Sequence, residues 1–240
     1  MARTINEQEY AARRTAILEA AHQLIVTKGY QQMSIQDLLD VLGISKGAFY
    51  HYFESKPALL TALIDRLIAG WERELVPIAE SDELPALECL RRFFAVLARA
   101  KTGDQAFLLS TLRVLYSDDN AVVLQKSRAA GQRRFAPLLT QIITRGVDEG
   151  VFDTSHPEHV GQAVVALVQD LVEQAGHLML EYAGRPDGPG AIEKVFAVYI
   201  EVLERALGIP AGSLELIDQQ TLRQWMPARS ETNTDPAYQP

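Results

Sequence analysis

The sequence has few of the features that mark secreted or membrane proteins. It contains one cysteine, Cys89, in 240 residues, which excludes an intramolecular disulfide framework and a Cys-rich metal site. The N-terminal residues MARTINEQEY are polar and charged, so no secretory signal is expected, and no run approaches the ~18 apolar residues of a membrane span. We therefore expect a cytoplasmic protein that makes no membrane contact.

Motifs for catalysis are also missing. The sequence has no Gly-x-Ser-x-Gly elbow, no Gly-rich phosphate loop and no Cys/His pair at a motif spacing. His156 and His159, beside Asp153 and Glu158, could ligate a metal, but Pro157 indicates a helix start on the surface, where such residues commonly act as caps. The sequence thus predicts no enzyme, no cofactor and no metal.

Hydrophobic residues make up 48% of the chain and charged ones 22%, which is ordinary for a globular protein with a sizeable core. The formal charge of -8 is unevenly spread, because six basic and six acidic side chains balance over residues 1–60. The whole excess of acid lies in the rest of the chain. An acidic body repels phosphate, so a nucleic acid would be approached by the neutral N-terminal part.

No alternating strand pattern or internal repeat is present, and apolar residues recur at helical spacing. The pattern predicts an all-α fold. A mobile arm is expected over residues 1–9, a bend near Pro137, and a disordered polar tail over 226–240. The expected helices cover 10–28, 34–42, 45–53, 55–75 (closed by Pro77), 84–100, 104–116, 121–149, 156–183, 191–207 and 213–225.

The stretch Met33 to Leu60, MSIQDLLDVLGISKGAFYHYFESKPALL, predicts a helix-turn-helix. Ser34 and Ser45 each stand where a side chain can accept hydrogen bonds from the first turn of a helix. Asp37 follows Ser34 at the capping-box spacing. Gly43 stands where the first helix must stop in a left-handed conformation, which costs glycine little.

On the second helix of this motif, Phe49, Tyr52 and Phe53 share the face expected to pack. The opposite face has little aliphatic bulk, so the backbone near Gly47 and Ala48 could approach base edges in a major groove. Lysine, tyrosine and histidine side chains beside it are candidates for phosphate oxygens. The predicted DNA-binding residues are Ser34, Gln36, Ser45, Lys46, Gly47, Ala48, Tyr50, His51 and Lys56.

The run SKGAFYHYFESKPALL, preceded by SIQDLLDVLGI, closely resembles the N-terminal motif of the TetR/AcrR transcriptional repressors. Leu38-Leu39 and Leu42-Gly43-Ile44 depart from the usual pattern on the packing side and leave the DNA-facing side unchanged. The resemblance implies a head over residues 1–56, a connector helix, a ligand-binding and dimerisation body over 57–225, and a dimeric repressor released from a palindromic operator by a small molecule.

The resemblance also places two long helices, about 156–183 and 191–207, in a four-helix interface with a second subunit, although they could instead pack internally. A ligand pocket is expected in the body between the connector and the following helices. Its candidate residues are Trp71, Phe94, Phe107, Tyr116, Gln169, Glu173 and His177.

One alternative from another class is an all-helical protein-interaction module that uses Phe49, Tyr50, Tyr52 and Phe53 as an aromatic docking patch. Burial distinguishes the two hypotheses. If Phe49, Tyr52 and Phe53 are buried while Tyr50 and His51 are exposed, the docking patch does not exist.

Overall fold

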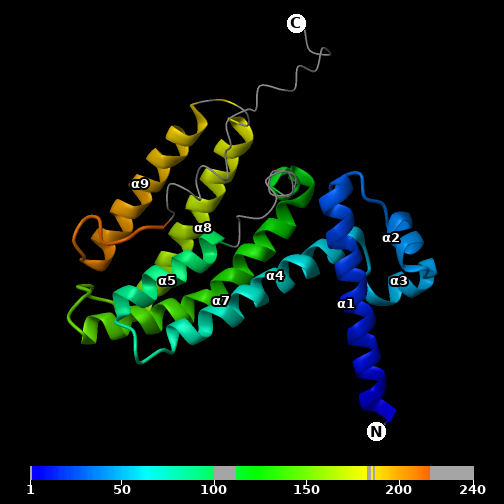
Figure 1. The fold of residues 1–240 in the computed structure, drawn as a ribbon, viewed down its shortest axis with the longest axis horizontal. Helices are drawn as coiled ribbons and strands as arrows, with labels where there is room; N and C mark the ends of the chain where they lie inside the picture. Colours follow the sequence, from blue (N-terminus) through cyan, green and yellow to red (C-terminus); the bar gives the residue numbers. More distant parts are fainter. Residues whose placement is uncertain (1, 100–111, 183–184, 186, 217–240) are drawn as a thin grey trace, which may run out of the picture.

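The computed structural model describes residues 2–99, 112–182, 185 and 187–216, and within them the chain is helical without any strand (Figure 1). The predicted all-α fold is confirmed. The elements are α1 (Ala2–Lys28), α2 (Ile35–Leu42), α3 (Lys46–Tyr52), α4 (Lys56–Ala79), α5 (Ala86–Arg99), the 3-10 turn η1 (Asp118–Asn120), α7 (Ala121–Asp148), α8 (Pro157–Glu181) and α9 (Gly188–Leu207).

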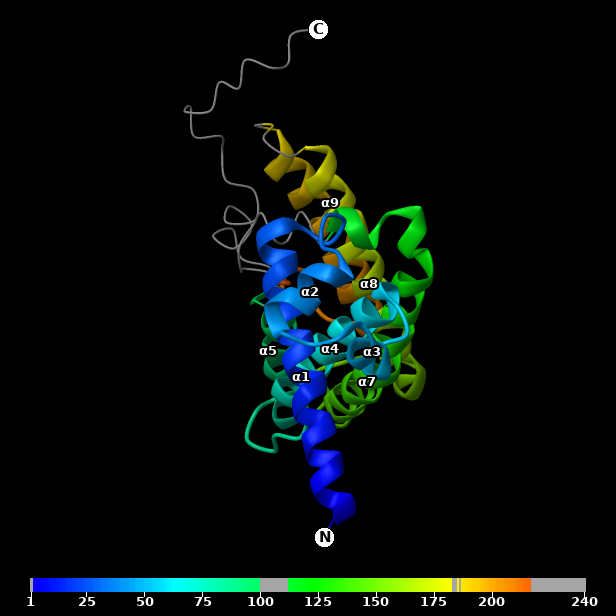
Figure 2. The ribbon, with the colours of Figure 1, turned by 90° about the vertical axis from the view of Figure 1, so that its right-hand side faces the viewer.

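The head is formed by α1, α2, α3 and the first turns of α4 (Figure 2). These helices enclose a small hydrophobic core of their own. Phe49 and Leu59 are fully buried in it. Val114 and Val123, which lie on either side of η1, belong to the same cluster. The head core therefore rests partly on the body, through the residues that flank η1.

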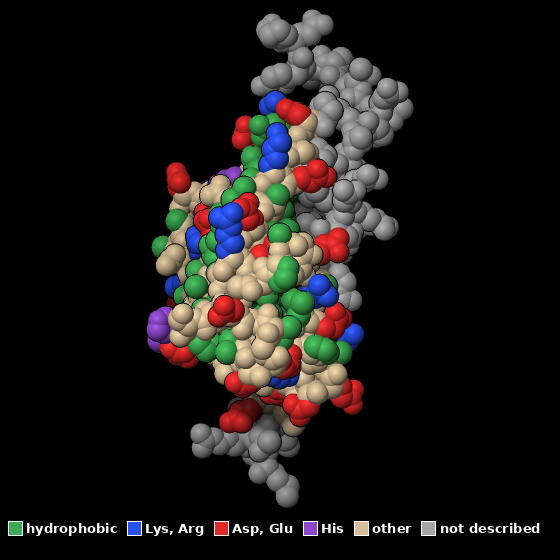
Figure 3. All heavy atoms as spheres, turned by 90° about the vertical axis from the view of Figure 1, so that its left-hand side faces the viewer, with side chains coloured by type: hydrophobic (Ala, Val, Ile, Leu, Met, Phe, Trp, Pro, Cys, Tyr) green, Lys and Arg blue, Asp and Glu red, His purple; other side chains and the backbone are tan. Residues whose placement is uncertain are grey.

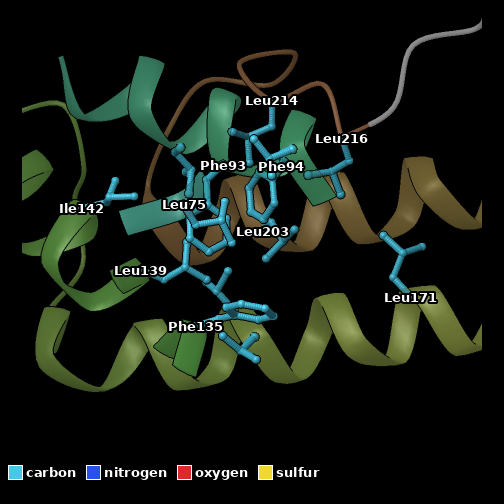
Figure 4. Packing of buried hydrophobic residues seen from close by; sticks show 14 of the residues in the cluster. Leu75, Phe93, Phe94, Phe135, Leu139, Ile142, Leu171, Leu203, Leu214 and Leu216 are labelled. Carbon is cyan, nitrogen blue, oxygen red and sulfur yellow. The ribbon is translucent and has the colours of Figure 1, made fainter. Parts of the chain in front are cut away.

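The body core lies between α4, α5, α7, α8 and α9 (Figure 4). Phe93 of α5 lies edge-to-face against Phe94 and Phe135, with ring centroids 6.1 and 6.3 Å apart, an arrangement that aromatic rings favour. Leu75 brings the far end of α4 into the same core. Because α4 starts in the head and ends in the body, it mechanically joins the two.

Three predicted helix boundaries are wrong. Helix α1 begins at Ala2, so residues 2–9 extend the first helix instead of forming a mobile arm. Pro77 lies inside the last turn of α4, which continues to Ala79 because Glu80 still donates to Val76. Helix α9 starts at Gly188, with Pro189 in the first turn, where a missing N–H is harmless.

The segment after α9 was predicted as a helix over 213–225, but residues 213–216 are not helical. Instead, 208–216 folds back across α5: the backbone N–H of Leu214 donates to the buried Glu204 carboxylate at 2.8 Å, and Arg91 Nε donates to the Ser213 carbonyl at 2.8 Å. Leu214 and Leu216 are buried in the body core. The rest of that predicted helix, the predicted tail over 226–240 and most of 104–116 lie outside the described residues.

Helix α7 runs without interruption through Pro137, although a break or bend was expected there. The sequence was expected to contain no segment resembling a membrane span. Helix α8, however, meets the criteria for one by its length and composition. Its most apolar 18-residue window has a mean hydropathy of 1.2, and 33% of that window is buried inside the chain. Most of the other apolar side chains of α8, such as Leu167 and Val168, are half-buried against the body core, so a further surface could still pack on this helix.

Candidate functional site

The two serine caps predicted for the helix-turn-helix are present. Ser34 Oγ accepts from the backbone N–H of Asp37 at 3.1 Å, and the Asp37 carboxylate accepts from the backbone N–H of Ser34 at 2.8 Å, which completes a capping box. Ser45 Oγ accepts from the N–H of Ala48 at 3.2 Å. Gly43 ends α2 in the left-handed region at φ 61°. The caps at Ser34 and Ser45 and the turn at Gly43 therefore define where α2 begins and ends and where α3 begins.

Helix α3 has one buried and one exposed face. Phe49 and Phe53 are 0% and 4% exposed and Tyr52 packs half-buried against the head core, whereas Tyr50 is 43% exposed and His51 is also exposed. The aromatic side chains are thus divided between the core and the surface. The docking-patch hypothesis is wrong, because its main members are inside the protein.

Two small residues, Gly47 and Ala48, follow Lys46 in the first turn of α3 and leave the backbone accessible there. Gly47 is exposed, and a Cβ placed there would meet only Ser45 Oγ, at 3.9 Å. Ala48 adds one methyl group beside it. A surface this flat allows close approach of another molecule to the start of the helix.

The cations of the head differ in how freely they can bind a phosphate. Lys46 is exposed on α3. Lys56 is half-buried, with its ammonium 3.3 Å from the Gln31 carbonyl and 4.3 Å from the centre of the Tyr30 ring, and burial lowers its pKa. Lys28 is held by Asp37 at 2.6 Å. Of these three, Lys46 is the cation least engaged within the head.

The start of α1 braces α3, which the sequence did not predict. Tyr10 lies 4.7 Å from the ring of Tyr52 and edge-on to His51 at 5.6 Å, and the Arg14 guanidinium lies 5.0 Å from the centre of the Phe53 ring. His51 is therefore oriented by a contact with α1. Of the other predicted residues on α2, Gln36 donates to Asp40 at 2.7 Å.

We expect Asp37→Asn to destabilise the head at neutral pH and to reduce its sensitivity to acid. The Lys28 ammonium and then the Ser34 donors hold the pKa of Asp37 well below its usual range. The pKa of this carboxyl is lower in the folded state than in the unfolded state, where it is ~3.9. The carboxylate therefore stabilises the fold at pH values above ~3.9, and this contribution is lost as the pH falls from there toward the lower pKa of the folded state. Thermal melting at about pH 7, 5 and 3 measures the effect.

The matched control is Asp40→Asn, which removes a carboxylate of the same helix that is bonded to the neutral amide of Gln36 instead of to an ammonium. It should cost less stability at neutral pH than Asp37→Asn. Equal melting temperatures for the two variants at every pH would show that the Lys28–Asp37 pair does not stabilise the motif.

A second candidate site is a cavity of ≈ 330 Å³, the body cavity, lined mainly by residues of α4, α5, α7, α8 and α9. Five of the seven predicted ligand residues line it: Trp71, Phe94, Tyr116, Gln169 and Glu173. Phe107 lies outside the described residues. His177 does not line the cavity, because its ring stacks on the outer side of Tyr116, with centroids 4.5 Å apart, and its side chain is 53% exposed.

Several residues that line the cavity were not predicted from the sequence, chief among them Arg128. Arg128 Nη1 binds Glu173 Oε2 at 2.7 Å, between α7 and α8. Leu216 reaches the cavity only because 208–216 folds back. The helical pattern of α7 puts Arg128 near Phe135, but nothing local reveals which face of a long helix will meet a cavity.

A further hollow of ≈ 420 Å³, the outer cavity, lies between α1 of the head and α4. Ile64, Leu67 and Trp71 of α4 line both cavities. One stripe of the connector helix is thus the wall between them.

The histidines considered for metal binding are at the start of α8, where His156 and His159 lie 3.7 and 3.8 Å from Glu158. Both are about three-quarters exposed. Within the part of the chain that the structure describes, no group of three or more His, Cys, Asp or Glu side chains could hold a metal ion.

Residues 17–63 match the family model described as bacterial regulatory proteins, tetR family. The chain is 48% identical over 102 residues to the HTH-type transcriptional regulator EthR of Mycolicibacterium smegmatis, covering 39% of this chain and 47% of that protein. It is 34% identical over 70 residues to the HTH-type transcriptional repressor NemR of Escherichia coli, covering 29% and 35%. The matched parts thus span less than half the length of these two curated relatives.

Among solved structures, the chain resembles Thermus thermophilus FadR, a TetR-family transcriptional repressor in complex with lauroyl-CoA. The TM-score is 0.59 at 21% identity, over 83% of this chain and 97% of that one. This similarity extends the shared fold from the head to the body. The helix-turn-helix with both caps and the matching family model agree, and residues 17–63 are a match to the tetR family of bacterial regulatory proteins.

Proposed function

We propose that this protein is a dimeric, DNA-binding transcriptional repressor that leaves a palindromic operator when a small molecule binds its body. The observation that carries the proposal is the geometry of α3: a capped helix with a buried aromatic face and an outer face whose first turn has only small side chains at Gly47 and Ala48. Such a helix can lie in a major groove, which is wide enough to admit it. NemR and FadR, to which the chain is similar, are described as repressors.

In this proposal the residues of the head divide between base edges and backbone. Gly47 and Ala48 lie against base edges, where Ala48 can touch a thymine methyl. Phosphate oxygens are contacted by Lys46, Tyr50, His51 and Lys56, while Ser34, Gln36 and Ser45 flank the contact at the starts of α2 and α3. Because the head has no net charge and the body is acidic, DNA binding depends on these few contacts and on their duplication in a dimer.

The dimer interface we propose consists of α8 and α9, the two helices predicted for it. Val198 and Val202 of α9 are 57% and 42% exposed, which is high for valine, and the Tyr199 hydroxyl bonds the Asp170 carboxylate of α8, so the two helices present one surface. Figure 3, viewed from the side of the body where α9 runs, shows hydrophobic side chains exposed between scattered charged ones. A second copy would cover this surface and the apolar face of α8.

Val198→Glu combined with Val202→Glu should give a folded monomer. Two carboxylates would be buried without partners in the proposed interface, at a cost larger than an ordinary homodimer contact can offset. The monomer should bind an operator at least about tenfold more weakly, because each head then binds alone. Sedimentation measures the mass, and Val151→Glu, at an exposed valine after α7, is the control that should leave the dimer intact.

The ligand response is proposed to act through α4. A molecule that fills the body cavity presses on Ile64, Leu67 and Trp71, and the outer cavity on the other side of this wall gives them room to move. Since α4 also carries Leu59 of the head core, its displacement changes the distance between the two heads of a dimer. The ligand must bind the released state more tightly than the DNA-bound state for this to occur.

The proposal keeps the predicted division of the chain into a head over 1–56, a body over 57–225 and a tail over 226–240, and a cytoplasmic location, where the DNA is. Its test is DNA binding by head variants. Tyr50→Ala and Lys56→Ala should weaken binding to all sequences alike, whereas Ala48→Ser should change the preferred bases. If Ala48→Ser leaves the sequence preference of a DNA-binding protein unchanged, α3 does not read the DNA.

A further inference from the structure

The walls of the body cavity are almost entirely apolar. Among its described lining residues, the polar side chains are those of Tyr116, Ser127, Arg128, Gln169 and Glu173. The rest are aliphatic or aromatic residues with small ones between them, including Phe93, Phe94 and Phe135 from the centre of the body core. A volume of ≈ 330 Å³ is near the lower end of the ~300–1,000 Å³ typical of sites for drug-sized ligands.

The only two charges among the described lining residues neutralise each other. Arg128 and Glu173 form an ion pair at 2.7 Å, with their side chains 35% and 24% exposed. An anionic ligand that displaced Glu173 from Arg128 would leave the Glu173 carboxylate unpaired in a partly buried site, which is costly. Burial and the nearby Glu173 raise the pKa of Tyr116, so its phenol stays neutral. The described lining therefore has no charge to offer an ionic ligand.

One strong acceptor in the lining has no partner among the residues that the structure describes. Gln169 Nε2 donates to the backbone carbonyl of Arg128 at 2.9 Å, and no described residue donates to the Gln169 amide oxygen. Gly131 is what allows this arrangement, because a Cβ there would lie 2.8 Å from Gln169 Nε2. A glycine inside a helix costs up to ~1 kcal/mol relative to alanine. Gly131 therefore lowers the stability of α7 at the position where the Gln169 amide lies against the cavity.

A second helical glycine makes similar room. Gly176 of α8 faces the Tyr116 ring, and a Cβ there would lie 2.6 Å from its hydroxyl, which donates to the Val172 carbonyl at 3.4 Å. With its proton directed to that carbonyl, the Tyr116 oxygen can act only as an acceptor toward the cavity. Both neutral polar groups at this end of the cavity can thus accept a hydrogen bond from a ligand.

We propose that the body cavity binds an uncharged, mainly apolar molecule that donates a hydrogen bond to the Gln169 amide oxygen, and that it excludes anionic ligands such as acyl-CoA thioesters. This inference rests on the proposed function, because it names the class of effector for that site. It separates this chain from the Thermus FadR to which its fold is similar and which was solved with lauroyl-CoA. The diphosphate of such a ligand needs cations that the described lining lacks.

Three probes that share one skeleton test the proposal on the purified full chain. N-phenyl-1-naphthylamine is uncharged, fluorescent when buried, and has one N–H donor. 8-Anilino-1-naphthalenesulfonate adds a sulfonate, and N-methyl-N-phenyl-1-naphthylamine lacks the donor. We expect the uncharged donor probe to bind at least about tenfold more tightly than the sulfonate, and lauroyl-CoA not to displace it. Tighter binding of the sulfonate, displacement by lauroyl-CoA, or no binding of any probe would overturn the proposal.

Two variants locate the contact. Gln169→Leu should weaken the N–H probe about three- to tenfold and leave the N-methyl probe unchanged, so the latter also reports whether the variant is folded. Glu173→Gln leaves Arg128 uncompensated and should improve sulfonate binding relative to the uncharged probe. An equal effect of Gln169→Leu on both uncharged probes would contradict a hydrogen bond to this amide.

These titrations contain no DNA, so the two proposals can fail separately. If the protein binds an operator but the probes rank in the opposite order, only the ligand class is wrong. If the probes rank as expected but no DNA is bound, the proposed function is wrong and the cavity serves another purpose.

Discussion

Phe49→Ala is expected to unfold the head and to abolish DNA binding while the body stays helical. Phe49 is fully buried between α1, α2 and α4, with its ring 6.0 Å from that of Phe53. Replacing a buried phenylalanine by alanine costs about 3–5 kcal/mol. A head of this size has few other contacts to offset that loss. Thermal melting should show a separate, early transition, and fluorescence anisotropy with labelled DNA should show no binding.

The matched control is Tyr50→Ala, one residue along the same helix. Tyr50 is 43% exposed and contributes little to the core, so its loss should leave melting nearly unchanged and weaken DNA binding alone. Phe49→Ala thus tests the stability of the head, and Tyr50→Ala tests its contact with DNA. If Tyr50→Ala destabilised the head as much as Phe49→Ala, the assignment of faces on α3 would be wrong.

Gly161→Ala should destabilise the body by about 1–3 kcal/mol, although alanine is the better helix former. Helices α7 and α8 cross closely at Gly161, where an added Cβ would lie 2.2 Å from Thr140 Oγ1, 2.6 Å from the Thr140 backbone nitrogen and 2.8 Å from the Ala136 carbonyl oxygen. Backbone atoms cannot move aside as a side chain can. The two helices must separate, and calorimetry of the purified protein measures the cost.

Gly70→Ala is the control, because it makes the same substitution inside another helix. A Cβ at Gly70 would meet only the end of the Arg73 side chain, at an ordinary 3.9 Å. Here alanine should stabilise the protein by up to ~1 kcal/mol. Opposite signs for the two variants are expected. The same sign for both would show that the α7–α8 crossing is not as tight as the geometry indicates.

The features that sequence reasoning predicted well depend on neighbours a few residues apart. The capping box of Ser34 and Asp37, the cap at Ser45 and the left-handed Gly43 each involve at most four consecutive residues. Helical periodicity likewise separated Phe49 from Tyr50, because the two faces of one short helix follow from a rotation of about 100° per residue. These features needed no knowledge of the rest of the chain.

The features that were missed depend on contacts between distant segments. Tyr10 meets His51 and Tyr52 across about forty residues of sequence, and no local pattern indicates that contact. Leu216 enters the body cavity because Glu204 anchors the returning chain at Leu214. Arg128 was not among the predicted ligand residues, because its partner Glu173 comes from another helix. Tertiary packing, which decides each case, is not encoded in a short window.

If α3 of each subunit reads one half of a palindrome, footprinting of the full chain on DNA upstream of its own gene should reveal it. We expect protection of two half-sites separated by one helical turn of DNA or more, at ~100 mM salt, and loss of that protection with Tyr50→Ala. A folded dimer that protects no site under these conditions would show that α3 does not read an operator.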